Sequence, residues 1–272
     1  MIASLSQTDS MNSDRENVIG IVGGMGPEAG VALYKRILSN TPAGSDQEHL
    51  SVMLMSFPGH IVDRTAFLEG VTHINPAYNV VKIIEKLETA GAGIIGIACN
   101  TSHAPEIFDV IMEELDRKNS SVTLVNMPLE TCLYIKDKYP FVRRVGVMAT
   151  NGTCKSGVYE NLLRRLGYDL VIPDSEFQND FIHRIIYDPW FGIKANPNCI
   201  TPEAKLLIER SICFFRERNT DAIILGCTEL SLGINKNVVD GLLIVDSMEV
   251  LALALIREAT SRIEAIIKMK DL

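Results

Sequence analysis

Two of the six cysteines in this 272-residue chain, Cys99 and Cys227, stand where thiols could transfer protons. Each directly follows a short apolar stretch and precedes polar residues, NTSH after Cys99 and TE after Cys227. Inverting a stereocentre by proton transfer needs a base on one face of the carbon and an acid on the other. A thiolate is the active base, and we expect backbone N–H groups and a helix N-terminus to favour it at both positions.

The segments around these cysteines have counterparts elsewhere in the chain. VIGIVGGMGP at 18–27 resembles RVGVMATNGT at 144–153, and GIIGIACNTSH at 93–103 resembles AIILGCTELS at 222–231. Gly20 precedes Cys99 by nearly the same number of positions as Gly146 precedes Cys227. In open α/β sheets ligands bind beyond the carboxyl ends of the strands, so we expect two similar units that present these cysteines to opposite sides of one substrate.

The alternative interpretation of any free cysteine is a small, buried, inert side chain. The duplication and the polar neighbours favour catalysis for Cys99 and Cys227. The other cysteines keep the structural interpretation; they are Cys132, Cys154, Cys199 and Cys213. No C-x-x-C pair or metal-finger spacing occurs, so no metal is expected.

Apolar stretches of strand length alternate with longer amphipathic segments, which is the pattern of βα units. The expected strands are 18–22, 52–56, 93–98, 122–126, 144–149, 168–172, 222–225 and 243–246. The expected helices are 27–38, 75–90, 105–119, 129–138, 157–166, 177–187, 202–218 and 248–268. These patterns predict an α/β fold of two pseudo-symmetric lobes, each a mostly parallel sheet flanked by helices, with the active site in the cleft between them.

The predicted organisation has three parts. Residues 1–17 form a flexible polar extension, 18–127 the first lobe and 128–238 the second lobe. The C-terminal segment 239–272 is expected to join the first lobe.

Composition excludes several classes of partner. The formal net charge is −8 and no dense cluster of Lys and Arg occurs, so no nucleic acid is expected. The apolar runs are far shorter than the ~20 residues that a bilayer span needs, so no membrane is expected. The polar N-terminal segment lacks the pattern of a secretion signal. We therefore expect a cytoplasmic protein with reduced thiols.

Seven short motifs, taken in order, resemble the aspartate/glutamate racemase family. They are GGMGP (23–27), DQEH (46–49), DRT (63–65), ACNTSH (98–103), ATNGT (149–153), SGVYE (156–160) and GCTEL (226–230). The set is more similar to the aspartate racemases than to the glutamate racemases, which open with a different glycine-rich motif. The resemblance implies a homodimer that needs no cofactor, pyridoxal phosphate included. It also implies racemisation by one cysteine from each lobe, here Cys99 and Cys227.

The resemblance further implies two cations that hold the side-chain carboxylate of aspartate. The matching positions are Arg64 in DRT and Lys194 in YDPWFGIKANPN. Arginine offers a planar fork of donors that suits a carboxylate, and lysine adds a second positive charge. The match at Arg64 is direct, whereas the segment around Lys194 carries extra residues relative to the family pattern. A surface cation is the alternative at each position.

Short polar side chains after the strands are expected to meet the substrate's α-carboxylate, because such loops make anion-binding nests. These contacts are Asn100, Thr101, Thr150, Thr153 and Thr228. Helix capping is the equally good alternative for the threonines. Met25 and Glu229 complete the predicted substrate site. His103 and Glu229 either tune the thiols or order the loops.

Other functions fit parts of the sequence. The segment from Gly24 to Ala29 matches the dinucleotide fingerprint, but the second strand ends in SFPG without the acidic residue that would hold a ribose. A turn that places Met25 at the substrate explains the glycines equally well. The remaining alternatives are a broad-specificity or glutamate racemase, a lyase or isomerase with facing cysteines, and a two-lobed amino-acid sensor.

Overall fold

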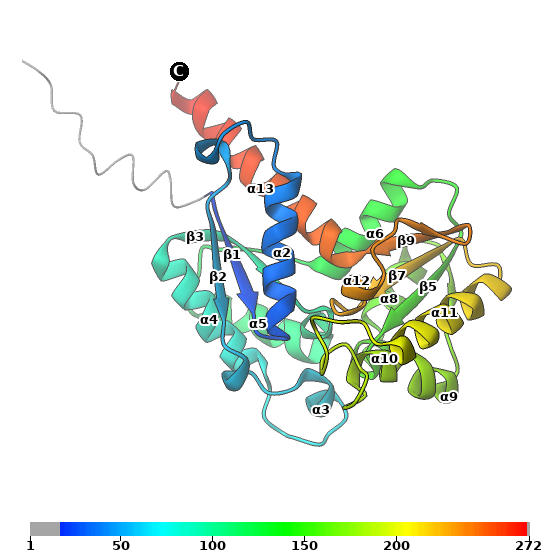
Figure 1. Ribbon diagram of the computed structural model, residues 1–272. Coiled ribbons are helices and arrows are strands. Elements are labelled where there is room, and N and C mark those ends of the chain that lie inside the picture. The colour runs from blue at the N-terminus through cyan, green and yellow to red at the C-terminus, as the bar shows by residue number, and fades with distance from the viewer. Residues whose placement is uncertain (1–16, 271–272) are drawn as a thin grey trace, which may run out of the picture.

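The computed structural model describes residues 17–270, which form two α/β lobes side by side (Figure 1). Except for Asn17, the predicted polar extension at 1–17 lies outside the described residues. Two separate sheets form the centres of the lobes. The predicted fold class is therefore confirmed.

The first lobe is built on a parallel four-stranded sheet. Its strand order is β2 (Val52–Ser56), β1 (Val18–Gly23), β3 (Ala92–Ile97) and β4 (Thr123–Val125). Its helices are α2 (Pro27–Asn40), α3 (Arg64–Leu68), α4 (Ala77–Ala90) and α5 (Pro105–Arg117), with 3₁₀ turns η1 (Asp46–Glu48), η2 (Pro58–His60) and η3 (Asn100–His103). One face of the sheet packs against α4 and α5, and the other against α2. The central strands are therefore covered on both faces, which explains their nearly continuous apolar sequences.

The second lobe is built on a five-stranded sheet. Its strand order is β6 (Asp169–Val171), β5 (Arg144–Ala149), β7 (Ala222–Gly226), β9 (Leu242–Asp246) and β8 (Val238–Val239). Only the pairing of β8 with β9 is antiparallel. Its helices are α7 (Asn151–Lys155), α8 (Val158–Arg165), α9 (Ser175–Phe177), α10 (Arg184–Tyr187), α11 (Pro202–Glu217) and α12 (Leu230–Gly233), with a π-helical segment η4 (Gln178–His183) between α9 and α10.

The two sheets repeat one strand order, since β2-β1-β3-β4 corresponds to β6-β5-β7-β9. Cys99 follows β3 and Cys227 follows the equivalent strand β7, as the duplicated motifs predicted. One boundary differs from the prediction, which placed all of 239–272 in the first lobe. β9 instead pairs in parallel with β7, because it completes the second sheet as β4 completes the first.

Two helices connect the lobes. α13 (Ser247–Lys270) follows β9 and runs across to the first lobe, where it lies against α2 (Figure 1). Met248, Leu251 and Leu255 of this helix are buried with residues of β1, β3 and α2. α6 (Met127–Lys138) follows β4, and its Cys132 is buried with residues of the second lobe. The segment 239–272, which was predicted to join the first lobe, is thus divided between the lobes. Its strand β9 belongs to the second sheet, and its helix α13 packs on the first lobe.

The predicted set lacks η1, η2, β8 and four further short elements, and these four lie where strands end or a loop turns toward the other lobe. They are α3, η3, α7 and α12. Each is only four or five residues long, too short for helical periodicity to be recognised in sequence.

Candidate active site

A cavity of about 380 Å³ lies between the lobes at the carboxyl ends of the strands. The first lobe contributes Met25 and Arg64 to its lining, and the second contributes Lys194, Thr228 and Glu229. The structure therefore brings five of the predicted site residues together around one space. Ile193, Pro197 and Leu232 add an apolar part that the sequence analysis missed, and Glu28 adds a carboxylate. A second cavity of about 570 Å³ beside α2, α6 and α13 contains none of the predicted site residues.

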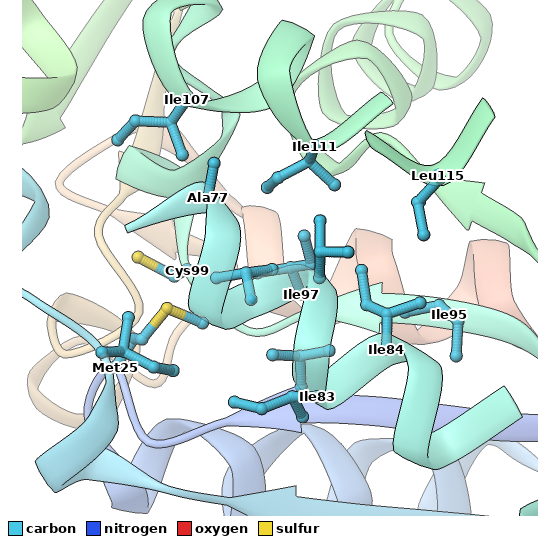
Figure 2. Close-up of a cluster of buried hydrophobic side chains, with 14 of the residues drawn as sticks. Met25, Ala77, Ile83, Ile84, Ile95, Ile97, Cys99, Ile107, Ile111 and Leu115 are labelled. Atoms are coloured by element: carbon cyan, nitrogen blue, oxygen red, sulfur yellow. The ribbon is translucent and has the colours of Figure 1, made fainter. Parts of the chain in front are cut away.

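Cys99 enters the site from the first lobe. It lies shortly after the end of β3 and directly before η3, and only 5% of its surface is exposed. Its side chain and that of Met25 lie at the same end of the apolar cluster between β3, α4 and α5 (Figure 2). Cys99 is therefore adjacent to a residue that lines the cavity without lining it itself.

Arg64 is held at the first-lobe wall by the start of α3. The Asp63 carboxylate caps this helix by accepting a hydrogen bond from the Ala66 backbone N–H at 2.8 Å. The Arg64 guanidinium donates to the backbone oxygens of Val62 at 3.2 Å and Met25 at 3.4 Å, whereas its buried Nε has no partner. Burial acts to lower the pKa of Arg64, but the electrostatic interactions with Cys99 and Asp63 outweigh it and raise the pKa. A permanent cation thus faces the cavity.

Cys227 enters the site from the second lobe and is the first member of a hydrogen-bonded chain. Its Sγ donates to Glu229 Oε2 at 3.0 Å, and Lys194 Nζ donates to Glu229 Oε1 at 2.6 Å. Thr228 Oγ1 also donates to Glu229 Oε2, at 3.1 Å. Both carboxylate oxygens of Glu229 are therefore occupied, and Lys194 is already paired with a negative charge.

The charge state of this chain differs from the sequence expectation. Burial, and then the charge of the Glu229 carboxylate, raise the pKa of the Cys227 thiol well above its usual value, although Lys194 opposes the shift. Burial acts to raise the pKa of Glu229, but Lys194 outweighs it and lowers the pKa. The expectation that a helix N-terminus favours the Cys227 thiolate is therefore wrong. α12 has only four residues, and an adjacent carboxylate faces the sulfur.

Three predicted threonines meet across the lobe boundary. The hydroxyl of Thr101 lies 3.1 Å from that of Thr150 and 2.9 Å from that of Thr153, and the last two are 3.1 Å apart. Thr150 also caps α7, since its hydroxyl accepts from the Thr153 N–H at 3.2 Å. Capping and clustering thus occur together. Hydroxyls can exchange these mutual contacts for contacts with a carboxylate, because each one both donates and accepts.

Gly152 permits this close approach of the lobes. A Cβ atom at this position would lie 2.8 Å from Thr65 Oγ1 and 3.1 Å from Thr101 Cγ2. Nearby, Lys155 Nζ of α7 forms an ion pair with Glu69 at 2.9 Å, which joins the same two lobes. A side chain at 152 would therefore push α7 away from α3 and η3.

Asn100 is occupied by protein partners. Its Oδ1 accepts from Tyr159 Oη at 2.5 Å and its Nδ2 donates to Ser247 Oγ at 3.0 Å. Tyr159 lies in α8 and Ser247 directly follows β9, so both partners belong to segments that follow strands of the second sheet. Asn100, the residue after Cys99, therefore links the two lobes. Tyr159 lies in the SGVYE motif, but neither it nor Ser247 was predicted as a partner because nothing in sequence spacing pairs them with Asn100.

His103 orders the loop that carries Cys99. Its Nδ1 lies 2.9 Å from the Cys99 backbone oxygen, and its Nε2 accepts from the Met127 N–H at 3.4 Å, which assigns the proton to Nδ1. Full burial lowers the pKa of His103 to about 4, so the imidazole is neutral at pH 7. Of the two roles considered for His103, ordering the loop is the one that these contacts support.

Asp63 and Tyr187 contact each other beside the residues of the site and were not predicted. Tyr187 Oη donates to Asp63 Oδ2 at 3.0 Å, and the Tyr187 ring lies beneath Lys194 Nζ, 5.2 Å from its centroid. Burial raises the pKa of the Tyr187 hydroxyl, which keeps it protonated. Tyr187 therefore connects the helix that holds Arg64 with the lysine on the opposite wall.

Among residues 17–270, no group of three His, Cys, Asp or Glu side chains could hold a metal ion. No helix in the same range is long and apolar enough to cross a membrane.

The model of the Asp/Glu/Hydantoin racemase family matches residues 22–255 of the chain. The chain belongs to this family. The matched range includes most of both lobes, both cysteines and every residue named around the cavity, so the resemblance seen in the motifs is confirmed.

A solved member of the family resembles the chain over most of its length. The aspartate racemase of Picrophilus torridus is 31% identical, with coverage of 90% of this chain and 94% of that chain and a TM-score of 0.74. The sequence match to the glutamate racemase of Pseudomonas aeruginosa is also 31% identical, but it covers 51% of this chain and 46% of that protein. The broad specificity amino-acid racemase RacX of Bacillus subtilis is 25% identical over 58% of this chain and 65% of that protein. The matches to these two racemases thus span about half to two thirds of their lengths.

Proposed function

We propose that this protein is a cofactor-independent aspartate racemase that inverts Cα with Cys99 and Cys227. The observation that carries the proposal is the cavity between the lobes, which has a buried arginine on one wall and a cysteine of equivalent position beside each wall. An acidic amino acid bound there would have one thiol toward each face of Cα. Family membership and the likeness to an aspartate racemase support the same reaction.

Each part of the substrate has a proposed partner. Arg64 and Lys194 bind the side-chain carboxylate, and Arg64 is the better donor because it forms no ion pair within residues 17–270. The hydroxyl cluster of Thr101, Thr150 and Thr153, together with Thr228, binds the α-carboxylate. One cysteine then removes the Cα proton as a thiolate while the other donates a proton to the opposite face.

Racemisation of a wider set of amino acids is the second candidate. Lys194 is already neutralised by Glu229, and Ile193, Pro197 and Leu232 make part of the cavity wall apolar. These features would tolerate side chains without a carboxylate. The match to a broad specificity racemase supports this reading. In either case we propose a homodimer, as the resemblance implies, and a cytoplasmic location.

Incubation of the pure protein with each L-amino acid in D₂O tests the function. The expected product is D-aspartate that carries deuterium at Cα, formed after dialysis against a chelator and without added pyridoxal phosphate. Alkylation of the thiols should abolish the product. Formation of several D-amino acids at similar rates would favour the broad specificity. Retained aspartate binding without any deuterium incorporation would replace the racemase with a sensor.

A further inference from the structure

Glu229 makes contacts that binding a substrate alone does not require. It is 6% exposed, and it lies between a thiol and an ammonium group, with one carboxylate oxygen on each. The first lobe closes this space from the other side, since a Cβ atom on Gly26 would lie 3.4 Å from Glu229 Oε1. The charged and titratable groups around Glu229 are Lys194 and Cys227 in direct contact, with Arg64 and Glu28 on the other wall of the same cavity.

The hydrogen-bond geometry connects Cys227 to a base. A thiol that donates to a carboxylate at 3.0 Å has its proton directed at the oxygen that would accept it. Lys194 holds the negative charge on Glu229, and the proton stays on sulfur while this ion pair is present. The same ammonium group faces the cavity, so a carboxylate of the substrate competes with Glu229 for it.

We propose that Glu229 accepts the Sγ proton of Cys227 when the side-chain carboxylate of the substrate takes Lys194 away from it. This inference rests on the proposed racemase function and names the group that activates one of its two thiols. The cysteine becomes a base only when an acidic substrate displaces Lys194, and otherwise the thiol stays protonated and unreactive.

Cys227 is the base in one direction of the reaction, and each proton in that direction has a donor and an acceptor. The Sγ–H bond of Cys227 breaks, its electron pair stays on sulfur, and the proton forms an O–H bond with Glu229 Oε2. The thiolate then takes the Cα proton on its face, and the thiol of Cys99 gives a proton to the opposite face. Cys99 is left as a thiolate and Glu229 as a carboxylic acid. Glu229 then loses its proton to water, and Cys99 gains a proton from water. These two exchanges restore the starting state.

In the opposite direction Cys227 is the acid, and Glu229 returns a proton to the thiolate that this step leaves, so Glu229 acts only through Cys227. Steady-state racemisation cannot reveal this, because its two directions share one equilibrium constant. Solvent deuterium exchange by single-cysteine variants can reveal it. The Cys99→Ser variant leaves Cys227 to exchange one enantiomer of aspartate, and the Cys227→Ser variant leaves Cys99 to exchange the other.

The test adds Glu229→Gln to each of these two variants and measures exchange of L- and D-aspartate in D₂O by mass spectrometry. We expect a loss of about a hundredfold or more in the variant that depends on Cys227, because general bases contribute that much, and less than tenfold in the variant that depends on Cys99. Glu130→Gln is the matched control, since Glu130 also accepts from a cation, Arg257 at 2.9 Å, away from the cavity. It should change neither rate.

Equal losses in both backgrounds would overturn the relay, because a merely structural role of Glu229 would disturb both cysteines. If neither single-cysteine parent exchanges any amino acid, the racemase function itself fails, which is a different outcome. The displacement step has its own readout in the Cys99→Ser variant. Saturating aspartate should exchange at least tenfold faster than saturating asparagine, which carries no side-chain charge, and Lys194→Met should remove that difference. A difference that persists without Lys194 would refute the displacement.

Discussion

Replacing Arg64 with leucine should weaken aspartate turnover far more than folding. Arg64 is 7% exposed as a residue, and its Nε is buried without a partner. Hydrogen bonds to charged groups contribute about 1.5–3 kcal/mol. Since 1.4 kcal/mol corresponds to a factor of ten, Arg64→Leu should lower kcat/KM for aspartate by roughly 10- to 150-fold.

The assay compares aspartate with asparagine, which has nearly the same shape without the side-chain charge. Only aspartate should lose kcat/KM in the variant if Arg64 binds the side-chain carboxylate. Arg257→Leu is the control, because Arg257 joins α13 and α6 through Glu130 and lies outside the cavity. Urea unfolding of both variants separates folding from function. A parallel loss for both amino acids would refute the assignment and place the α-carboxylate on Arg64, and no loss would make Arg64 structural.

Three further changes probe the surroundings of the thiols. The pKa of His103 is about 4 in the folded protein and about 6.5 in the unfolded chain, so the unfolded chain binds the proton first as pH falls. About 3 kcal/mol of the free energy of unfolding, present above pH 6.5, should therefore be lost progressively by pH 4. Urea unfolding measures this loss, which should be smaller in the His103→Gln variant. Tyr159→Phe leaves Asn100 Oδ1 buried without its donor and should reduce the free energy of unfolding by about 1–3 kcal/mol, measured at constant pH. Gly152→Ala forces a Cβ within 2.8 Å of Thr65 Oγ1, and we expect kcat/KM to fall on the order of tenfold to a hundredfold while far-UV circular dichroism stays unchanged.

The sheets could be predicted from sequence because their signal is local. Strands such as 144–149 and 222–225 are apolar runs bounded by turn residues, and all eight expected strands overlap strands of the structure. The duplicated motifs further predicted that Cys99 and Cys227 occupy equivalent positions. That inference needed only two similar strand ends and their spacing.

The contacts inside the site could not be predicted, because they join residues far apart in sequence. Lys194 pairs with Glu229, and Tyr159 with Asn100, although no periodicity relates either pair. The expected thiolate at Cys227 failed for a different reason: the Glu229 carboxylate is close in sequence, but its orientation toward the sulfur is not visible there. The wrong lobe for β9 reflects another limit. A single strand pattern does not indicate which sheet the strand joins.

The path of α13 has a consequence for synthesis of the chain. The apolar core of the first lobe contains Met248, Leu251, Ala252, Leu255 and Ala259, which are made after every strand of both sheets. A nascent chain that has emerged only as far as residue 127 therefore has α2 but not α13 on this face of its sheet. We expect it to expose Ile19, Ile21 and Ile94 more than the finished protein does, and exposed apolar surface of this kind favours aggregation. The lobe translated first is thus among the last parts of the molecule to complete its core.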